Sequence, residues 1–194
     1  MNLPKRDFQF HTYAEYCTWP DDQRYELIDG VAYAMNAPNR MHQEFVGELY
    51  FQIAAALRDR PCRIYVSPFD VRLPRRNEAD EQVTTVLQPD LLIVCDPSKL
   101  DERGCRGAPD WVAEILSPAT ASYDHILKRS AYEAAGVGEY WLVHPVDRML
   151  TVYRLEHGRY GIPQYYELSG RLALGVLPEV EVDWEQLFVA IGKA

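Results

Sequence analysis

The sequence predicts a mixed α/β fold of the α+β kind, in which one sheet is flanked by two main helices. Between Arg40 and Arg58, apolar residues recur every three or four positions, which indicates an amphipathic helix. Two mostly apolar runs, 88–94 and 110–117, have the length and composition of buried strands. Because helices and strands follow one another in blocks, we expect them to pack in layers around a shared core.

The first part of the chain predicts a short helix and a hairpin ahead of that long helix. Residues 11–19 carry aromatic side chains at helical spacing. Residues 25–28 and 31–35 are strand-like and flank Asp29-Gly30, a pair that readily adopts the positive φ values of a type I′ turn. Residues 36–39 break the second strand and offer a cap for the long helix.

The rest of the chain predicts further strands and one more helix. Residues 62–73 have the pattern of a strand with a break at Pro68, and 74–81 that of a polar, mobile loop. A second helix is expected from about Ser122 to Ala135, where Gly136 ends it. Further strands are expected over 139–144, 149–155, 160–168 and 172–177, before an acidic C-terminal segment with Trp184, Leu187 and Phe188.

Length and composition are those of an ordinary globular protein. The chain has 194 residues, of which 47% are hydrophobic and 25% charged. This length suffices for one substantial core but is short for two, so we expect a single domain over residues 1–194. No apolar stretch approaches the ~20 residues that span a bilayer, and the N-terminal residues lack the apolar run of a signal peptide.

Charge and cysteine content narrow the function classes. The formal net charge of −9 argues against a protein that coats nucleic acid non-specifically, although an enzyme needs only a local basic rim. The four cysteines show no metal-ligand spacing, and Cys95 ends an apolar run as a buried thiol would. We therefore expect a reduced, cytoplasmic protein that does not associate with membranes.

Two carboxylates stand in runs where a buried strand normally carries apolar residues. Asp90 opens the first run, and Glu114 lies near the end of the second. An ionised carboxylate in an apolar interior costs several kcal/mol and needs a pairing cation or a metal. If the two runs pair as antiparallel strands, the start of one lies beside the end of the other, and the acids meet. The pattern predicts a divalent-metal site.

The second predicted helix carries a lysine that could reach these acids. Asp124, Lys128 and Tyr132 are spaced so that they lie on one stripe of the helix. Lys128 lies several residues inside the helix, roughly 9 Å along its axis. On spacing alone, an ordinary surface ion pair between Asp124 and Lys128 is the more frequent outcome.

An ordered set of short motifs extends along most of the chain. They are Tyr25-Glu26-Leu27-Ile28-Asp29-Gly30, His42, Gln88-Pro89-Asp90-Leu91, Ala108-Pro109-Asp110, Glu114-Ile115-Leu116-Ser117-Pro118, Asp124 to Lys128 with Tyr132, and Gly138-Glu139-Tyr140-Trp141-Leu142-Val143. In this order, over about 25–188, they resemble the Uma family of restriction-type endonucleases, a group long classed as a domain of unknown function. The two acids and a downstream lysine also resemble the wider PD-(D/E)xK nuclease superfamily.

The resemblance implies a restriction endonuclease-like core, with a mixed sheet flanked by helices and additional antiparallel strands. It implies a metal-dependent endonuclease that hydrolyses DNA phosphodiester bonds as a homodimer. Asp90, Glu114 and the main-chain carbonyl of Ile115 would hold Mg²⁺ or Mn²⁺. The superfamily places its lysine two residues after the second acid, where this chain has Leu116, so Lys128 would supply the amine from the helix.

Three auxiliary residues accompany this set, and their roles stay open. Glu26, on a hairpin strand, is either a further acid ligand, direct or through water, or an exposed strand acid. His42, on the buried stripe of the long helix, either bonds a site carboxylate, contacts the scissile phosphate or is simply an inward histidine. Asp124 shares the stripe of Lys128.

Basic residues form two groups that could follow a DNA backbone. These groups are Arg58, Arg60 and Arg63, and Arg72, Arg75 and Arg76. A solvated face is at least as frequent an explanation for each group.

Two other function classes remain open. The displaced lysine and the net charge of −9 favour a catalytically silent binding or scaffold protein of the same fold, or a metal-dependent hydrolase of a smaller phosphate ester. The retention of Asp90, Glu114 and Lys128 favours the endonuclease.

Overall fold

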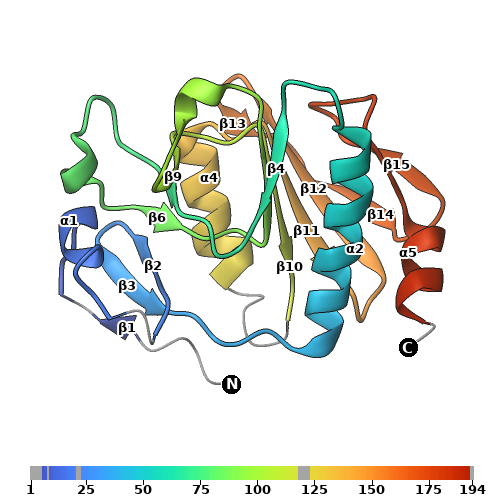
Figure 1. Cartoon of the computed structure of the whole chain (residues 1–194), viewed down its shortest axis with the longest axis horizontal. Coiled ribbons are helices and arrows are strands. Elements are labelled where there is room, and N and C mark those ends of the chain that lie inside the picture. Colours follow the sequence, from blue (N-terminus) through green and yellow to red (C-terminus); the bar gives the residue numbers. More distant parts are fainter. Residues whose placement is uncertain (1–5, 8, 21–22, 118–122, 193–194) are drawn as a thin grey trace.

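The computed structural model describes residues 6–7, 9–20, 23–117 and 123–192. Within these ranges the chain forms two large sheets, a small third sheet and helices that pack against them (Figure 1). The mixed α+β fold is therefore confirmed, whereas the single sheet that we expected is wrong. None of the helices in these ranges has the length and apolar character needed to cross a membrane.

The first sheet is built around the predicted hairpin. Its strand order is β1-β3-β2-β6-β5-β9-β8. These strands are β1 (Arg6–Asp7), β2 (Tyr25–Ile28), β3 (Val31–Ala34), β5 (Val71–Arg72), β6 (Val86–Leu87), β8 (Leu100–Asp101) and β9 (Gly104–Arg106). Asp29, with φ of 53°, and Gly30, with φ of 81°, form the turn between β2 and β3, as the Asp-Gly pair predicted.

The second sheet carries the two acid-bearing runs, and we call it the site sheet. Its strand order is β13-β12-β11-β10-β7-β4, with β14 paired to β12. These strands are β4 (Arg63–Val66), β7 (Leu91–Val94), β10 (Trp111–Ile115), β11 (Glu139–His144), β12 (Met149–Glu156), β13 (Arg159–Tyr160) and β14 (Gln164–Glu167). β10 pairs antiparallel with β7 and parallel with β11, so the sheet is mixed.

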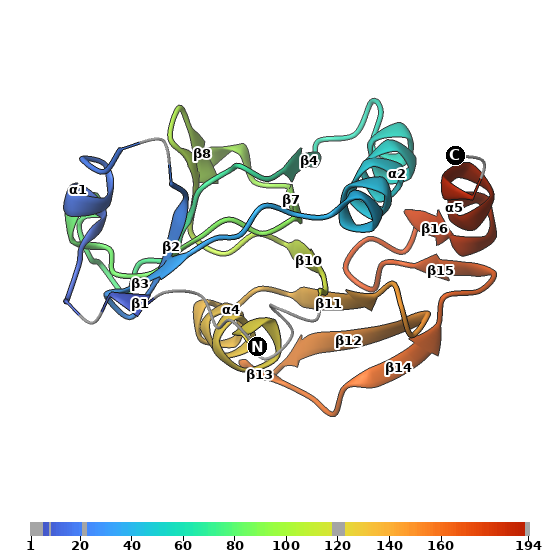
Figure 2. The ribbon, with the colours of Figure 1, turned by 90° about the horizontal axis from the view of Figure 1, so that it is seen from below.

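Helices cover both faces of the site sheet (Figure 2). On one face, Leu91 and Ile93 of β7 belong to the core that contains α2 (Arg40–Ala56) and α5 (Trp184–Ile191). On the other face, Leu92 and Val94 belong to the core that contains α4 (Arg129–Ala135). This division follows from the alternation of side chains along a strand. The remaining elements are α1 (Tyr13–Tyr16), the 3₁₀ turns η1 (Asp80–Gln82) and η2 (Pro97–Lys99), the π-helical turn η3 (Asp124–Lys128), and the two-stranded sheet of β15 (Arg171–Ala173) and β16 (Glu181–Asp183).

The ends of the two main helices agree with the local sequence signals. The Asn39 side chain accepts a hydrogen bond from the His42 main-chain N–H at 2.9 Å and caps the start of α2. Gly136, with φ of 91°, ends α4 in the left-handed conformation that glycine favours. The expected start of the second helix near Ser122 lies outside the described residues.

Several predicted strands are longer than the observed ones. The break predicted at Pro68 is confirmed, since the run 62–73 divides there into β4 and β5. The run 160–168, which we expected to be one strand, divides into β13 and β14 on either side of Pro163. Proline has no N–H to donate to a sheet ladder, so pairing is interrupted there. The last run pairs only as far as Ala173, because Leu174 already donates its N–H across a turn to Val180 at 2.9 Å.

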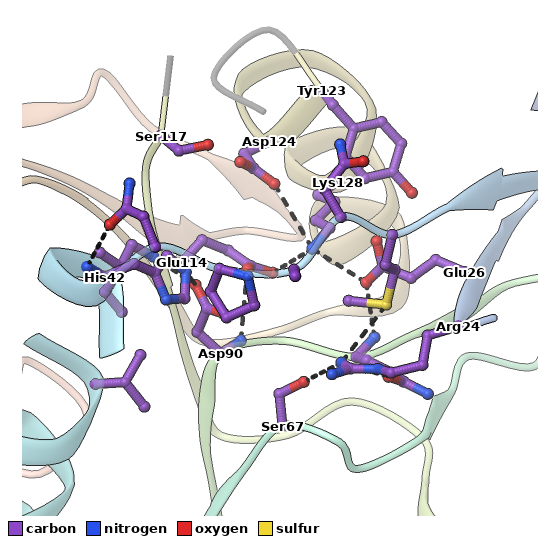
Figure 3. Close-up of a pocket in the computed structure, with 18 of the residues that line it drawn as sticks. Arg24, Glu26, His42, Ser67, Asp90, Glu114, Ser117, Tyr123, Asp124 and Lys128 are labelled. Carbon is purple, nitrogen blue, oxygen red and sulfur yellow. Dashed lines mark hydrogen bonds and ion pairs between the residues drawn. The ribbon is translucent and has the colours of Figure 1, made fainter. Parts of the chain in front are cut away.

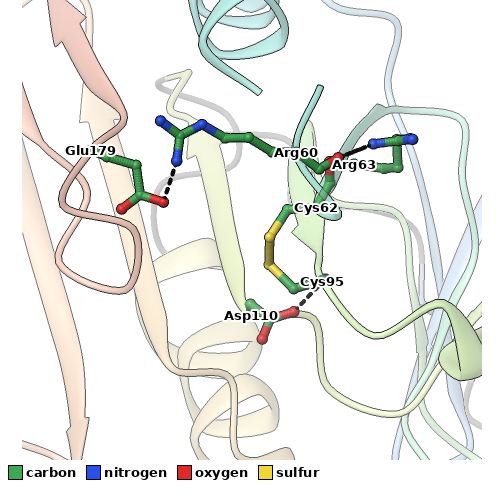
Figure 4. The surroundings of a disulfide bond; sticks show 6 residues. All are labelled: Arg60, Cys62, Arg63, Cys95, Asp110 and Glu179. Atoms are coloured by element: carbon green, nitrogen blue, oxygen red, sulfur yellow. Dashed lines mark hydrogen bonds and ion pairs between the residues drawn. A yellow bond between two sulfur atoms is a disulfide. The ribbon is translucent and has the colours of Figure 1, made fainter. Parts of the chain in front are cut away.

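Cys62 and Cys95 form a disulfide bond (Figure 4). β4 runs antiparallel to β7 with Arg63 opposite Val94, which brings the two cysteines face to face at the strand ends. The expectation that Cys95 is a lone buried thiol is therefore wrong. The two cysteines are separated by 33 positions, a spacing that carries no signal without knowledge of the strand register.

Arg72 lies in the interior and does not belong to a DNA-facing surface. It is fully buried, and its guanidinium bonds Asp80 and Asp101 at 2.6 Å each. Asp80 also pairs with Arg103 and Arg106. This network holds part of the polar segment that we expected to be a mobile loop, because a buried guanidinium needs carboxylate partners.

Candidate active site

Asp90 and Glu114 lie at the same end of the site sheet, as antiparallel pairing predicted. Ala113 is opposite Leu91, so the next pair outward brings Asp90 beside Glu114. The Asp90 main-chain N–H donates to Glu114 Oε2 at 3.4 Å. The local pattern of two acid-bearing strands is therefore enough to bring these carboxylates together.

Lys128 is buried at the centre of an acidic cluster (Figure 3). Its Nζ lies 3.0 Å from Glu114 Oε1, 3.0 Å from Glu26 Oε1 and 3.6 Å from Asp124 Oδ1. The Lys128 side chain is only 5% exposed. A surface ion pair with Asp124, the outcome that spacing alone favoured, is therefore wrong.

The segment that carries Lys128 is a π-helical turn rather than the regular α-helix that we expected. In the turn η3, backbone hydrogen bonds span five residues instead of four, which widens the helix locally. Lys128 Nζ also lies 5.5 Å from the centre of the Tyr123 ring, close enough for a cation–π contact. Turns of this kind occur often at functional sites, and the sequence pattern does not reveal them.

Glu114 is held by buried partners that restrict its carboxylate. The Tyr132 hydroxyl donates to Glu114 Oε1 at 3.1 Å, and Lys128 bonds the same oxygen. Burial raises the pKa of Glu114 well above its ordinary value; the charge of Lys128 opposes this effect, and the charges of Asp90, Asp124 and Glu26 add to it. Burial alone would lower the pKa of Lys128, but the surrounding carboxylates outweigh this effect and raise it well above its ordinary value. The cluster therefore attracts positive charge beyond that of its one lysine.

Glu26 is part of the same cluster although it comes from the other sheet. It lies on β2, is 2% exposed and accepts a hydrogen bond from the Gln88 main-chain N–H at 2.8 Å. The alternative of an exposed strand acid is wrong. Its contact with Lys128 joins the hairpin to the site sheet.

Of the three roles that the sequence left open for His42, the structure shows contact with a site carboxylate. Its Nε2 lies 2.9 Å from Asp90 Oδ2, and the Ile115 main-chain N–H donates to the same oxygen at 2.8 Å. The contact places the start of α2 against the site sheet. His42 Nδ1 is buried and has no hydrogen-bond partner within the described part of the chain.

These residues line a cleft of about 360 Å³ between the hairpin, α2 and η3. The cleft also contains Arg24 and Tyr123, which we did not identify from the sequence. One signal for Arg24 was available. It stands two positions before Glu26, and alternate residues of a strand face the same side.

The side chains in the cleft suit a hard divalent cation by their chemistry. Over the described ranges, no group of three or more His, Cys, Asp or Glu side chains is arranged to hold a metal ion. Asp90, Glu114 and the Ile115 carbonyl nevertheless offer oxygen donors within an excess of negative charge, and Mg²⁺ usually keeps several of its waters. Two carboxylates and one carbonyl therefore fit such an ion.

If Asp90 is a ligand of Mn²⁺, we predict that His42→Gln weakens binding of this ion by about 10-fold, because partners of a metal-binding carboxylate orient it and tune its basicity. Isothermal titration calorimetry measures this change. His144→Gln is a matched control, since His144 bonds Thr151 at 3.2 Å and does not line the cleft. Equal affinities for the His42 variant and the parent chain would contradict a positioning role.

The comparison with protein families shows to which family the chain belongs. Residues 12–185 match the Uma2 family, which is described as "Putative restriction endonuclease". The chain belongs to the Uma2 family. This Uma2 chain is similar to an uncharacterized protein of Synechocystis sp., with 27% identity over 163 residues that cover 82% of each protein. It is also similar to a peptide deformylase of Agrobacterium fabrum, with 28% identity over 105 residues. This match covers 48% of the Uma2 chain and 62% of the deformylase, which is less than two thirds of its length.

Among solved structures, the Uma2 chain is similar to the crystal structure of a "putative nuclease belonging to DUF820" from Anabaena variabilis. The TM-score is 0.73, and the match covers 93% of this chain and 98% of the other. At 19% sequence identity, this likeness shows a shared fold. Family and fold together indicate a restriction endonuclease-like nuclease.

Proposed function

We propose that this Uma2 chain is a metal-dependent endonuclease that hydrolyses DNA phosphodiester bonds. One observation carries the proposal: Asp90 and Glu114, on neighbouring strands, lie in one cleft with the buried amine of Lys128. Two carboxylates and an amine are the groups that phosphodiester hydrolysis needs, because charge develops on the phosphate and on the leaving oxygen.

The proposed metal ligands are Asp90, Glu114 and the main-chain carbonyl of Ile115, with Mg²⁺ or Mn²⁺ as the ion. When bound, the ion would supply charge stabilisation at the phosphoryl oxygen and lower the pKa of water. His42 would fix the orientation of Asp90, and Tyr132 that of Glu114, through the hydrogen bonds described above.

Lys128 would act through its ammonium group. An ammonium has three N–H donors, and in this cluster Glu114, Glu26 and Asp124 surround it. To hold the attacking water or a phosphoryl oxygen, it would exchange at least one of these partners. Glu26 and Asp124 would then act as auxiliary acids that keep the amine protonated and in place.

The same contacts support a second candidate, a catalytically silent binding protein of this fold. All three acids hold Lys128 inside the structure, and Leu116 occupies the position where the superfamily has its lysine. In such a protein the lysine would be purely structural. A hydrolase of a smaller phosphate ester is the third candidate.

Metal binding and DNA cleavage separate the three candidates. Calorimetry with Mn²⁺ should detect binding that is about 100-fold weaker in Asp90→Asn, which removes a ligand charge but keeps the side-chain shape. Asp147→Asn, at an exposed turn, is the matched control. Absence of binding in the parent chain would favour the silent protein, whereas binding without cleavage of supercoiled plasmid would favour the smaller ester.

We also propose a homodimer, because two copies of the site would be needed to cut both strands of a duplex. Sedimentation equilibrium at micromolar concentration tests this part independently of cleavage.

A further inference from the structure

Among the described residues, Arg24 is the cation of the cleft that forms no ion pair with a carboxylate, although the charge of Asp70 acts on it from farther away. Lys128 is surrounded by carboxylates, and His42 pairs with Asp90. Arg24 instead bonds neutral acceptors. Its Nη2 lies 2.6 Å from Ser67 Oγ, 2.8 Å from Gln88 Oε1 and 3.6 Å from Met35 Sδ, and its Nε lies 3.0 Å from the same Gln88 oxygen. An arginine outside an ion pair can bind another anion through its remaining N–H donors.

A second set of hydrogen bonds fixes the orientation of the Gln88 amide. Gln88 Nε2 donates to Asp70 Oδ1 at 2.8 Å and to the Tyr16 hydroxyl at 3.0 Å. Because the amide nitrogen is engaged there, the amide oxygen must face Arg24. The guanidinium is thus held in one plane before any ligand arrives.

The partners of Arg24 also tie it to the proposed metal ligands. The Ser67 main-chain N–H donates to the Asp90 carbonyl at 3.2 Å, and Gln88 stands two residues before Asp90 in the chain. Figure 3 shows the Arg24 side chain extending toward Ser67, on the side of the cleft away from His42. The position of the charge is therefore set relative to Asp90.

One edge of the guanidinium is left for a ligand. Of its five N–H donors, those on Nε and Nη2 face Gln88, Ser67 and the Met35 sulfur, and Nη1 has no hydrogen bond to any described residue. A planar group with free donors, beside a site for phosphodiester chemistry, matches a phosphate oxygen.

We propose that Arg24 binds a non-scissile phosphate next to the one that is cleaved. This inference rests on the proposed function and specifies its substrate: a polynucleotide strand with at least two consecutive phosphates, rather than an isolated phosphodiester. Arg24 is then a positioning residue, which sets the register of the strand over Asp90 and Glu114.

The test compares a short DNA duplex with bis(p-nitrophenyl) phosphate, a diester that has a single phosphate. Arg24→Gln should raise KM for the duplex about 10-fold, as expected when a phosphate contact that holds the strand in place is lost. The kcat for bis(p-nitrophenyl) phosphate should stay unchanged. Equal losses on both substrates would show that Arg24 only supports the structure and would overturn the proposal.

A binding measurement makes the inference independent of cleavage. In fluorescence anisotropy with a labelled duplex, the slope of log K against log salt should become shallower by about 0.9 in Arg24→Gln, and Arg24→Lys should retain the parental slope. Arg159→Gln, which removes an exposed charge outside the cleft, is the matched control and should have no effect. An unchanged slope in Arg24→Gln, or an equal change in Arg159→Gln, would overturn the proposal.

If the parent chain cleaves neither substrate, the nuclease assignment fails, and the salt-dependence slopes still decide whether Arg24 binds phosphate.

Discussion

Replacing Lys128 with methionine is expected to lower kcat for DNA cleavage by about 10²–10³-fold, the usual effect of losing one preorganised electrostatic group. The same change should destabilise the fold by about 3–5 kcal/mol, because it leaves buried carboxylates without their cation. Both effects follow from the contacts of one amine with Glu114, Glu26 and Asp124.

Two measurements separate chemistry from stability in this variant. Urea unfolding reports the loss of stability, and steady-state cleavage of plasmid DNA at saturating substrate reports kcat. Lys128→Arg keeps the charge but not the compact shape of the ammonium, so it should retain most of the stability while cleaving poorly. Lys99→Met is the matched control, since Lys99 donates to the Ala108 carbonyl at 2.8 Å and does not line the cleft. Full cleavage by the Lys128 variants would contradict the proposed role.

Replacing Trp141 with alanine is expected to cost about 3–5 kcal/mol of unfolding free energy, the range for removing a large aromatic side chain from a core. Trp141 is fully buried in the centre of the site sheet. Its ring packs edge-to-face on Trp111 with centroids 5.4 Å apart and lies 6.3 Å from Trp184 of α5. Its Nε1–H also donates to the buried Glu139.

Denaturant titration followed by circular dichroism measures this change. Trp19→Ala is a suitable comparison, because Trp19 is only half-buried beside α1 and should give a clearly smaller loss. A loss below about 1 kcal/mol for Trp141→Ala, close to the range of surface substitutions, would contradict its place in the core.

The sequence was sufficient to predict the parts of the site that depend on neighbouring strands. Asp90 and Glu114 could be placed together because antiparallel pairing relates the start of one run to the end of the next. The turn at Asp29-Gly30 and the cap at Asn39 follow from short-range chemistry that glycine, aspartate and asparagine carry with them.

The parts that the sequence did not predict depend on long-range placement. The burial of Lys128 requires a π-helical turn and a hairpin from a different sheet, neither of which changes the spacing of residues along the chain. The Cys62–Cys95 bond and the burial of Arg72 likewise depend on which strands become neighbours. Arg24 could have been found from its position two residues before Glu26, but its bonds to Ser67 and Gln88 depend on long-range placement.

The position of Lys128 between two sheets has a mechanical consequence. The Lys128 amine forms ion pairs with Glu26 of the hairpin and with Glu114 of the site sheet, and so links the first sheet to the second. A substrate or cation that draws the amine toward one side loosens its hold on the other. Ligand binding in the cleft would therefore change how rigidly the hairpin is attached to the site sheet. The charge of Lys128 would then affect both catalysis and the rigidity of this attachment.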